Sequence, residues 1–212
     1  MTPASAPSAA QELYRNAFKR ALDLALIVFV APIWLPVILV GAFLAALDGH
    51  NPFYRQERVG RFGRTFWIWK LRTMVVNADA KLEAYLDANP EARAEWDATQ
   101  KLKHDPRITL VGRILRKTSL DELPQLFNVL IGDMSLVGPR PMMVSQKDLY
   151  TGDGYYTVRP GLTGLWQVSD RNECRFIDRV SYDETYAAKM SFGMDLSILM
   201  RTVGVVVRGT GY

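Results

Sequence analysis

Hydrophobic and polar positions divide the chain into one long apolar run and several shorter patterned segments. The apolar run, residues 24–47, contains 24 residues and no charged side chain, and about 20 apolar residues suffice for a helix to cross a bilayer. Pro32 and Pro36 lie near its middle, where a proline removes a backbone hydrogen bond and bends a helix. The pattern therefore predicts a membrane segment that is broken near its centre.

Basic residues flank this run on both sides. Arg15, Lys19 and Arg20 precede it, and a second basic cluster begins at Arg55. Because positive charge marks the cytoplasmic side, a spanning helix would have to carry one cluster across the bilayer. We therefore expect residues 18–48 to form a re-entrant helix-break-helix, with a kinked spanning helix as the alternative. Residues 1–17, rich in small side chains, are expected to form a flexible N-terminal segment.

The remaining patterns predict an α+β, mainly helical domain over residues 49–212. Residues 53–70 alternate aromatic and polar side chains around a glycine-containing connection, which is typical of a β-hairpin. Residues 78–101 predict two charged helices divided at Asn89 and Pro90. Residues 109–117 predict an amphipathic helix that lies on a membrane or packs on the core. Two further helices are expected over residues 178–189 and 194–208.

Composition limits the kinds of partner and of binding site that the chain can have. The 26 Lys and Arg residues outnumber the 22 Asp and Glu residues, and the net charge of +4 suits an anionic partner such as nucleic acid, phospholipid or nucleotide phosphate. Cys174 is the only cysteine, so an internal disulfide is excluded. His50 and His104 stand far apart, which argues against the usual zinc sites. The sequence also lacks a P-loop and the glycine pattern of a dinucleotide-binding turn.

The segment Ser-Leu-Asp-Glu-Leu-Pro, residues 119–124, carries two adjacent carboxylates. Ser119 and Glu122 have the spacing of a capping box at a helix start. Pro124 fits that helix poorly, because it would be the fifth helical residue, so the helix is expected to begin nearer Asp121. The pattern leaves two interpretations open for Asp121 and Glu122, a helix cap and a catalytic pair.

Two loops place an arginine beside a proline. Arg140 lies in residues 132–141 and Arg159 in residues 159–164. Proline restricts the backbone, so a neighbouring guanidinium can be held ready for a phosphate or a base edge. An ordinary rigid turn explains the same pattern.

Taken together, four motifs resemble the bacterial sugar transferase family, the monotopic phosphoglycosyl transferases. They are Ala31-Pro32 inside the apolar run and the segments 53–74, 105–141 and 159–172. The resemblance covers nearly the whole chain from Phe18 onward. It implies a small, minimal member, most similar to the exopolysaccharide-initiating galactose-1-phosphate transferases.

The resemblance implies transfer of a hexose-1-phosphate from a UDP-sugar to a polyprenyl phosphate, undecaprenyl phosphate, with release of UMP. In this family the Asp-Glu pair is the active centre, which matches Asp121 and Glu122 here. Asp121 would attack the β-phosphorus and form a phosphosugar-enzyme intermediate. Glu122 would bind a metal or position Asp121, and Mg²⁺ is the expected cofactor, held by both carboxylates.

The resemblance also implies which other residues contact the substrates or shape the site. Phosphoryl transfer depends on alignment and charge stabilisation, and the candidates for contacting phosphates are Lys70, Arg72 and Arg140. Arg140 and Arg159 are candidates for contacting uridine diphosphate. Asp183 is a candidate for shaping the site, with a surface helix acid as the alternative.

UDP-sugars are cytoplasmic, so the resemblance favours the re-entrant arrangement, at the bacterial inner membrane with the catalytic domain on its cytoplasmic face. The expected partners are the two substrates and inner-membrane lipids, not nucleic acid, and a homo-oligomer is left open. The family break is often Ser-Pro; Ala31-Pro32 lacks the hydroxyl that would satisfy a freed backbone group.

Two rival functions are weighed against this one. A membrane-associated glycosyltransferase would move only the sugar and release UDP. A membrane-anchored basic module would bind nucleic acid or anionic lipid through the arginines and aromatic residues of the hairpin.

Overall fold

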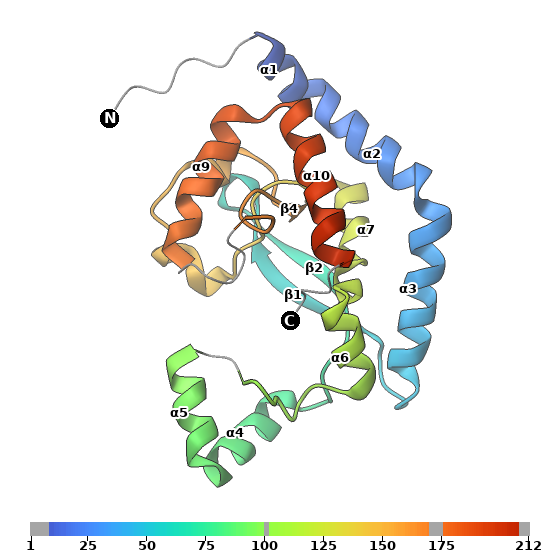
Figure 1. The fold of residues 1–212 in the computed structure, drawn as a ribbon, viewed down its shortest axis with the longest axis vertical. Coiled ribbons are helices and arrows are strands. Elements are labelled where there is room, and N and C mark those ends of the chain that lie inside the picture. The colour runs from blue at the N-terminus through green and yellow to red at the C-terminus, as the bar shows by residue number, and fades with distance from the viewer. Residues whose placement is uncertain (1–8, 100–101, 170–175, 208–212) are drawn as a thin grey trace.

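The computed structural model describes residues 9–99, 102–169 and 176–207. Within them the helices are α1 Ala9–Leu13, α2 Lys19–Phe29, α3 Ala31–Ala46, α4 Ala78–Ala88, α5 Pro90–Thr99, α6 Leu110–Lys117, α7 Gln125–Ile131, α8 Gly154–Thr157, α9 Arg179–Lys189 and α10 Phe192–Val207. The strands are β1 Phe53–Val59, β2 Thr65–Leu71, β3 Ser135–Val137 and β4 Gly161–Thr163. A π-helical turn, Tyr14–Phe18, joins α1 to α2. The expected mainly helical architecture with a small antiparallel hairpin is confirmed (Figure 1).

The apolar run folds into two helices that meet at a sharp bend. The helical stretches Gln11–Phe29 and Ala31–Ala46 are inclined by 65°. Pro32 lies in the first turn of α3, where a missing N–H costs little, while Pro36 lies inside α3, which continues past it. Within the described residues no single helix is long and apolar enough to cross a bilayer, whereas this bent pair passes that test together.

The bend leaves a carbonyl that a side chain satisfies. The indole Nε1 of Trp34 donates to the carbonyl oxygen of Ile27 at 3.0 Å, across the break. Trp34 itself is buried against α2 and α7. An aromatic N–H from the following helix thus supplies the donor that a serine hydroxyl at position 31 does not provide here.

The N-terminal segment joins the fold earlier than we expected. Residues 1–8 lie outside the described part, but residues 9–17 are helical and not an extended tail. Tyr14 is buried, and its hydroxyl donates to Asp195 of α10 at 2.6 Å. The ammonium of Lys19 contacts the same carboxylate oxygen at 2.6 Å, so a buried polar contact connects the two ends of the described chain.

A shared core connects the bent helix pair to the hairpin through α7. β1 and β2 pair antiparallel, with Arg58 opposite Phe66. Asn128 of α7 is fully buried; its amide donates to the Trp67 carbonyl at 2.7 Å, and its oxygen accepts from the Trp69 N–H at 3.1 Å. The core cluster consists of Ile27, Trp34, Ile38, Ile68, Leu126, Val129 and Met134. This packing fixes the turn before α7 against β2.

A short parallel pair supports the other side of that turn. Val137 of β3 is paired with Thr163 of β4. Gly161 lies so close to β3 that a Cβ there would come within 2.1 Å of the Gly138 nitrogen, which requires glycine at this contact. Because β3 and β4 run parallel, Arg140 follows the end of β3 whereas Arg159 precedes the start of β4, so the two arginines lie at opposite ends of the pair.

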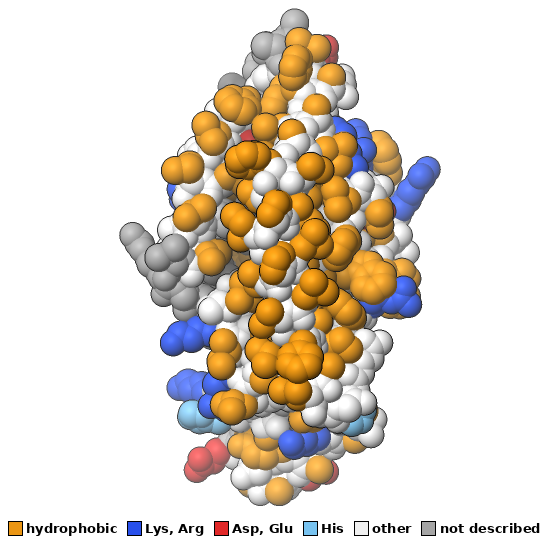
Figure 2. All heavy atoms as spheres, turned by 90° about the vertical axis from the view of Figure 1, so that its right-hand side faces the viewer, with side chains coloured by type: hydrophobic (Ala, Val, Ile, Leu, Met, Phe, Trp, Pro, Cys, Tyr) orange, Lys and Arg blue, Asp and Glu red, His pale blue; other side chains and the backbone are white. Residues whose placement is uncertain are grey.

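One face of the molecule is strongly apolar. Figure 2 shows hydrophobic side chains gathered along the face formed by α2 and α3, with basic side chains at its borders. α6 contributes Leu110 and Ile114, which are 76% and 59% exposed, while its Leu115 packs inward on Ala42 and Leu71. The amphipathic helix expected over residues 109–117 is therefore present and packs on the core through Leu115, while contact of its exposed face with a membrane stays a prediction. The expected charged helices, α4 and α5, project away from this face (Figure 1).

Candidate active site

The Glu122 carboxylate forms ion pairs with two cationic side chains from separate elements. It lies in a single helical turn, Leu120–Glu122, between α6 and α7. Lys70 of β2 places its Nζ 2.8 Å from the Glu122 Oε1, and the Arg140 guanidinium lies 3.1 Å from the same oxygen. The structure thus brings together Lys70, Glu122 and Arg140, three of the residues singled out in the sequence.

The backbone of this turn differs from the expected cap. Ser119 has a left-handed backbone, with φ of 56° and ψ of 19°, and its side chain makes no capping bond. The capping interpretation of Ser119 is therefore wrong. α7 begins only at Gln125, with Pro124 just before it, where a missing N–H leaves no bond unmade. A non-glycine residue in this conformation costs on the order of 1 kcal/mol and persists where its surroundings hold it.

The two adjacent carboxylates have opposite electrostatic environments. Asp121 is 9% exposed. Burial and the nearby Glu122 raise the pKa of Asp121 to about 6, against the lowering effect of Lys70. Burial alone would raise the pKa of Glu122, but Arg140 and Lys70 outweigh it and hold that pKa well below its usual range. Glu122 is therefore a fixed anion, and Asp121 is the more basic carboxylate of the pair.

Glu122 lies between two different clefts. The polar cleft is lined by Arg58, Ile68, Lys70, Glu122, Gln125, Arg140, Pro141, Gly161 and Leu162. The apolar cleft, of about 250 Å³, extends from Glu122 and Arg140 to the C-terminal half of α10, where Leu199, Val205 and Val206 line it. Asp121 is not among the residues that line either cleft, and the charges that act on its carboxylate are those of Lys70, Glu122 and Arg116.

Arg58 belongs to the polar cleft, although sequence reasoning did not place it among the site residues. It is buried, donates to the Pro141 carbonyl at 3.3 Å, and its Nε has no hydrogen-bond partner among the described residues. Burial and the nearby Arg140 lower the pKa of Arg58 to about 10. The signal was available: Lys70 pairs with Tyr54, so the hairpin register puts Lys70 and Arg58 on one face.

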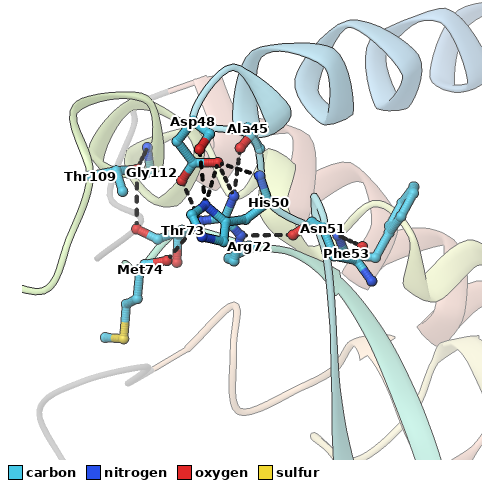
Figure 3. Close-up of polar contacts among 10 residues, drawn as sticks. All are labelled: Ala45, Asp48, His50, Asn51, Phe53, Arg72, Thr73, Met74, Thr109 and Gly112. Carbon is cyan, nitrogen blue, oxygen red and sulfur yellow. Dashed lines mark hydrogen bonds and ion pairs between the residues drawn. The ribbon is translucent and has the colours of Figure 1, made fainter. Parts of the chain in front are cut away.

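Arg72 has a different position from its neighbour Lys70. Figure 3 shows its guanidinium enclosed by the end of α3 and the loop before β1. It donates to Asp48 at 2.6 and 2.7 Å, to the Ala45 carbonyl at 2.8 Å and to the Asn51 carbonyl at 2.7 Å. These contacts tie the bent helix pair to the hairpin. The structure does not bring Arg72 to Glu122, and its role with phosphates stays a prediction.

Arg159 and Asp183 also lie apart from Glu122. Arg159 donates to the Gly132 carbonyl at 2.9 Å and lines a separate cleft. Asp183 is buried in α9 and accepts from the Tyr150 hydroxyl at 3.1 Å. Burial raises its pKa to about 6 despite the nearby Arg179, and Arg179 in turn donates to the Arg140 carbonyl at 2.7 Å. Asp183 is therefore not the surface acid that we considered. It is connected to the site indirectly, through Arg179, which donates to the Arg140 carbonyl.

A divalent cation fits this site only together with a substrate phosphate. Among the described residues no cluster of three His, Cys, Asp or Glu side chains could hold a metal. Mg²⁺ is commonly held by one or two carboxylates, with substrate phosphates and water completing its six ligands. Asp121 and Glu122 match that donor set, provided that a phosphate-bearing substrate is present.

Comparison with known proteins identifies the family. The model of the family described as bacterial sugar transferase matches residues 14–209. The chain belongs to the bacterial sugar transferase family. The expected resemblance is confirmed, and the match covers the bent helix pair as well as the domain around Glu122.

Curated relatives of this sugar transferase carry informative names. The UDP-galactose-lipid carrier transferase of Erwinia amylovora is 48% identical over 195 residues, covering 91% of this chain and 41% of the relative. The undecaprenyl-phosphate galactose phosphotransferase of Salmonella typhimurium is 46% identical, with the same coverage of 91% and 41%. The exopolysaccharide production protein ExoY of Rhizobium meliloti is 44% identical, covering 90% and 84%. The chain thus spans about two fifths of the length of the first two relatives.

Proposed function

We propose that this sugar transferase moves a hexose-1-phosphate from a UDP-sugar to undecaprenyl phosphate, releases UMP and so initiates exopolysaccharide synthesis. The observation that carries the proposal is the position of Glu122 between a basic polar cleft and an apolar cleft. One substrate of such a reaction is a water-soluble diphosphate and the other a lipid, so each cleft suits one of them. The names of the relatives from Salmonella and Rhizobium support the same assignment.

The polar cleft is the proposed site of the donor diphosphate. Arg58, Lys70 and Arg140 line it together, and guanidinium groups bind phosphate oxygens in pairs. In this structure Lys70 and Arg140 both form ion pairs with Glu122. A bound diphosphate would form ion pairs with these two cations and would accept a hydrogen bond from the Arg58 Nε, which has no partner among the described residues.

The reaction proceeds in two displacements. A carboxylate oxygen of Asp121 attacks the β-phosphorus, a new P–O bond forms, and the bond between that phosphorus and the bridging oxygen breaks, so UMP leaves. A phosphate oxygen of the lipid then attacks the same phosphorus, and the bond to Asp121 breaks, which restores the carboxylate. Mg²⁺, held by Asp121 and Glu122 with the diphosphate, would neutralise charge on the phosphate oxygens. Lys70 and Arg140 stabilise the charge that develops on the transferred group.

The apolar cleft is the proposed path of the acceptor chain. Leu162, Leu199, Val205 and Val206 line it, and it begins at Arg140 and Glu122. A lipid phosphate placed at that end would lie beside the attacking centre, with its hydrocarbon chain along α10. The exposed apolar residues of α10, Met200 and Val203, continue this surface outward.

The bent helix pair is the proposed membrane anchor, entering and leaving on one face. Its exposed side chains include Phe29, Ile33, Leu39 and Phe43, and burying such apolar surface in lipid is favourable. The UDP-sugar donor is cytoplasmic, so the catalytic domain would lie on the cytoplasmic face of the inner membrane. A helix that dips and returns leaves both flanking basic clusters on that face.

The test is UMP release from a panel of UDP-sugars with undecaprenyl phosphate and Mg²⁺ in detergent. Wild type is expected to release UMP with one preferred donor, and Asp121→Asn is expected to lose at least about a thousandfold in rate, because nucleophile removal abolishes the covalent route. Asp148→Asn, an exposed carboxylate, is the matched control and should retain full activity. Release of UDP would assign the chain to glycosyl transfer, and full activity of Asp121→Asn would contradict the role of Asp121.

A further inference from the structure

Three arginines from distant segments converge in a second cleft. Arg15 precedes α2, Arg61 lies in the hairpin turn, and Arg159 precedes β4. All three line the same cleft, which we call the arginine cleft; its other lining residues are Lys19, Asp23, Ser135, Thr157, Val158 and Met190. Arg15 and Arg61 both donate to the Thr157 carbonyl, at 2.9 and 3.0 Å. The fold thus gathers cations that the sequence places far apart.

The acidic groups near this cleft are already engaged. Asp195 contacts Lys19 at 2.6 Å and also accepts from Tyr14 and Tyr186. Asp23 accepts from the Ser135 hydroxyl at 2.7 Å and from the Leu136 N–H at 3.2 Å. Within the described part of the chain, Arg15, Arg61 and Arg159 form no ion pair with a carboxylate. The cleft therefore carries excess positive charge.

The three guanidinium groups are close enough to affect one another. Burial lowers the pKa of Arg61, and the charges of Arg159 and Arg15 lower it further. A guanidinium carries five N–H donors, while the bonds to Thr157 and Gly132 engage one nitrogen of each arginine. Donors remain for an anion, and an anion would relieve the mutual repulsion of the three charges.

The cleft lies beside the helix that we propose to enter the membrane. Arg15 is four residues before α2, and its chain neighbours Leu13 and Phe18 are 57% and 59% exposed. Apolar side chains next to arginine at the start of a membrane helix are typical of the headgroup region, where basic residues meet lipid phosphates. The polar cleft at Glu122 has a different lining, without any of these three arginines.

We propose that the arginine cleft binds a phosphate group outside the catalytic centre, supplied by the headgroup of an anionic phospholipid beside α2. This source rests on the proposed membrane insertion, whereas the phosphate chemistry rests on the three arginines alone. A bound headgroup would fix the N-terminal turn, the hairpin turn and the β4 loop against the membrane. It would thereby hold the catalytic domain at a set orientation to the lipid surface.

The test measures binding, so it does not depend on the transferase reaction. The full chain in an uncharged, phosphate-free detergent is titrated with dihexanoyl phosphatidylglycerol and, separately, with UDP. Arg61→Gln is expected to weaken phosphatidylglycerol binding about tenfold, because it removes one charge-assisted contact. Arg64→Gln is the matched control: it makes the same charge change in the same turn, and Arg64 is exposed. Its affinity should stay within about twofold of wild type, since screened surface charges contribute little.

The two ligands distinguish the sources of phosphate. UDP binding that is equally sensitive to Arg61→Gln would keep the phosphate site and assign it to the nucleotide. Equal effects of Arg61→Gln and Arg64→Gln, or binding of neither ligand through Arg61, would overturn the proposal. Arg15→Gln repeats the test from the helical side, and thermal unfolding of each variant shows whether it is folded. A wild-type chain that shows no transferase activity but binds phosphatidylglycerol through Arg61 would count against the proposed function and leave this site standing.

Discussion

Lys70 and Arg72 lie two residues apart at the end of β2, yet they belong to two different regions of the molecule. The Lys70 ammonium lies in the polar cleft, 2.8 Å from Glu122. The Arg72 guanidinium lies at the end of α3, where three backbone carbonyls and Asp48 surround it (Figure 3). A similar charge at nearly the same sequence position thus contacts Glu122 at the proposed reaction centre in one region and attaches the helix pair to the hairpin in the other.

The difference shows that the groups that accept hydrogen bonds from a cation indicate its role. Backbone carbonyls are fixed acceptors, so an arginine that they surround is held as a structural link. A cation paired with a single carboxylate in an open cleft can exchange that partner for a substrate phosphate. The type of acceptor, more than the charge or the distance along the chain, separates the two roles.

Among the substitutions that compare these two regions, the largest effect is expected from Lys70→Met. We expect kcat/KM for the UDP-sugar to fall about a hundredfold, as for loss of one group that stabilises transition-state charge. The unfolding temperature should change little, because Arg140 still contacts Glu122. Steady-state UMP release and thermal unfolding measure the two quantities, and Lys70→Arg should recover part of the rate. A purely structural Lys70 would show the reverse pattern.

Arg72→Met is expected to lower the stability of the fold and to leave kcat/KM nearly unchanged. It removes two bonds to Asp48 and three to the carbonyls of Ala45, Asn51 and Met74. We expect a loss of about 3 kcal/mol of unfolding free energy, from carbonyls left without a donor, with kcat/KM within about threefold of wild type at low temperature. Denaturant unfolding checks the first part. A hundredfold loss of kcat/KM in a folded variant would return Arg72 to the substrate site.

Asp183 gives a pH-dependent test. Its folded pKa is raised to about 6, whereas an unfolded Asp has a pKa of about 3.9. Between those values the native chain holds a proton that the unfolded chain has released, so unfolding free energy falls as pH rises through this window. We expect Asp183 to contribute about 3 kcal/mol of this fall, from a shift of about two pKa units at about 1.36 kcal/mol each. The difference between wild type and Asp183→Asn isolates the contribution, and parallel pH curves would contradict it.

Trp34→Phe should give the smallest effect, confined to the bend. The substitution keeps a six-membered aromatic ring and removes the five-membered part of the indole, with the N–H that satisfies the Ile27 carbonyl. We expect a loss of about 1 kcal/mol of stability, the lower end for one unmade buried hydrogen bond. Trp67→Phe, at an exposed position, is the control. Equal unfolding temperatures for the two variants would mean that the break does not depend on this bond.

Patterns of period two and of helical spacing predicted the hairpin, the α4–α5 pair and α6 correctly, because local residue preferences decide these elements. They also placed the break in the apolar run. The motif resemblance predicted the Lys70, Glu122 and Arg140 cluster, which residue types alone left open.

Other features depended on contacts that no local pattern contains. Ser119 matched a capping box, but the turn that contains Glu122 and follows the left-handed Ser119 is held by packing against α6, β2 and α3. The donor to the Ile27 carbonyl comes from a tryptophan seven residues away. The separation of Arg159 from Arg140 follows from the parallel pairing of β3 and β4, which joins segments distant in sequence.

The central claim is that Asp121 forms a covalent bond to the transferred phosphosugar. It is tested most directly by mass spectrometry of the intact protein after incubation with the preferred UDP-sugar and Mg²⁺, without any acceptor lipid. We expect wild type to gain the mass of one hexose phosphate, located on the peptide that contains Asp121, with one UMP released per chain, and Asp121→Asn to gain nothing. Wild type that gains no mass and releases UMP only when undecaprenyl phosphate is added would contradict the account.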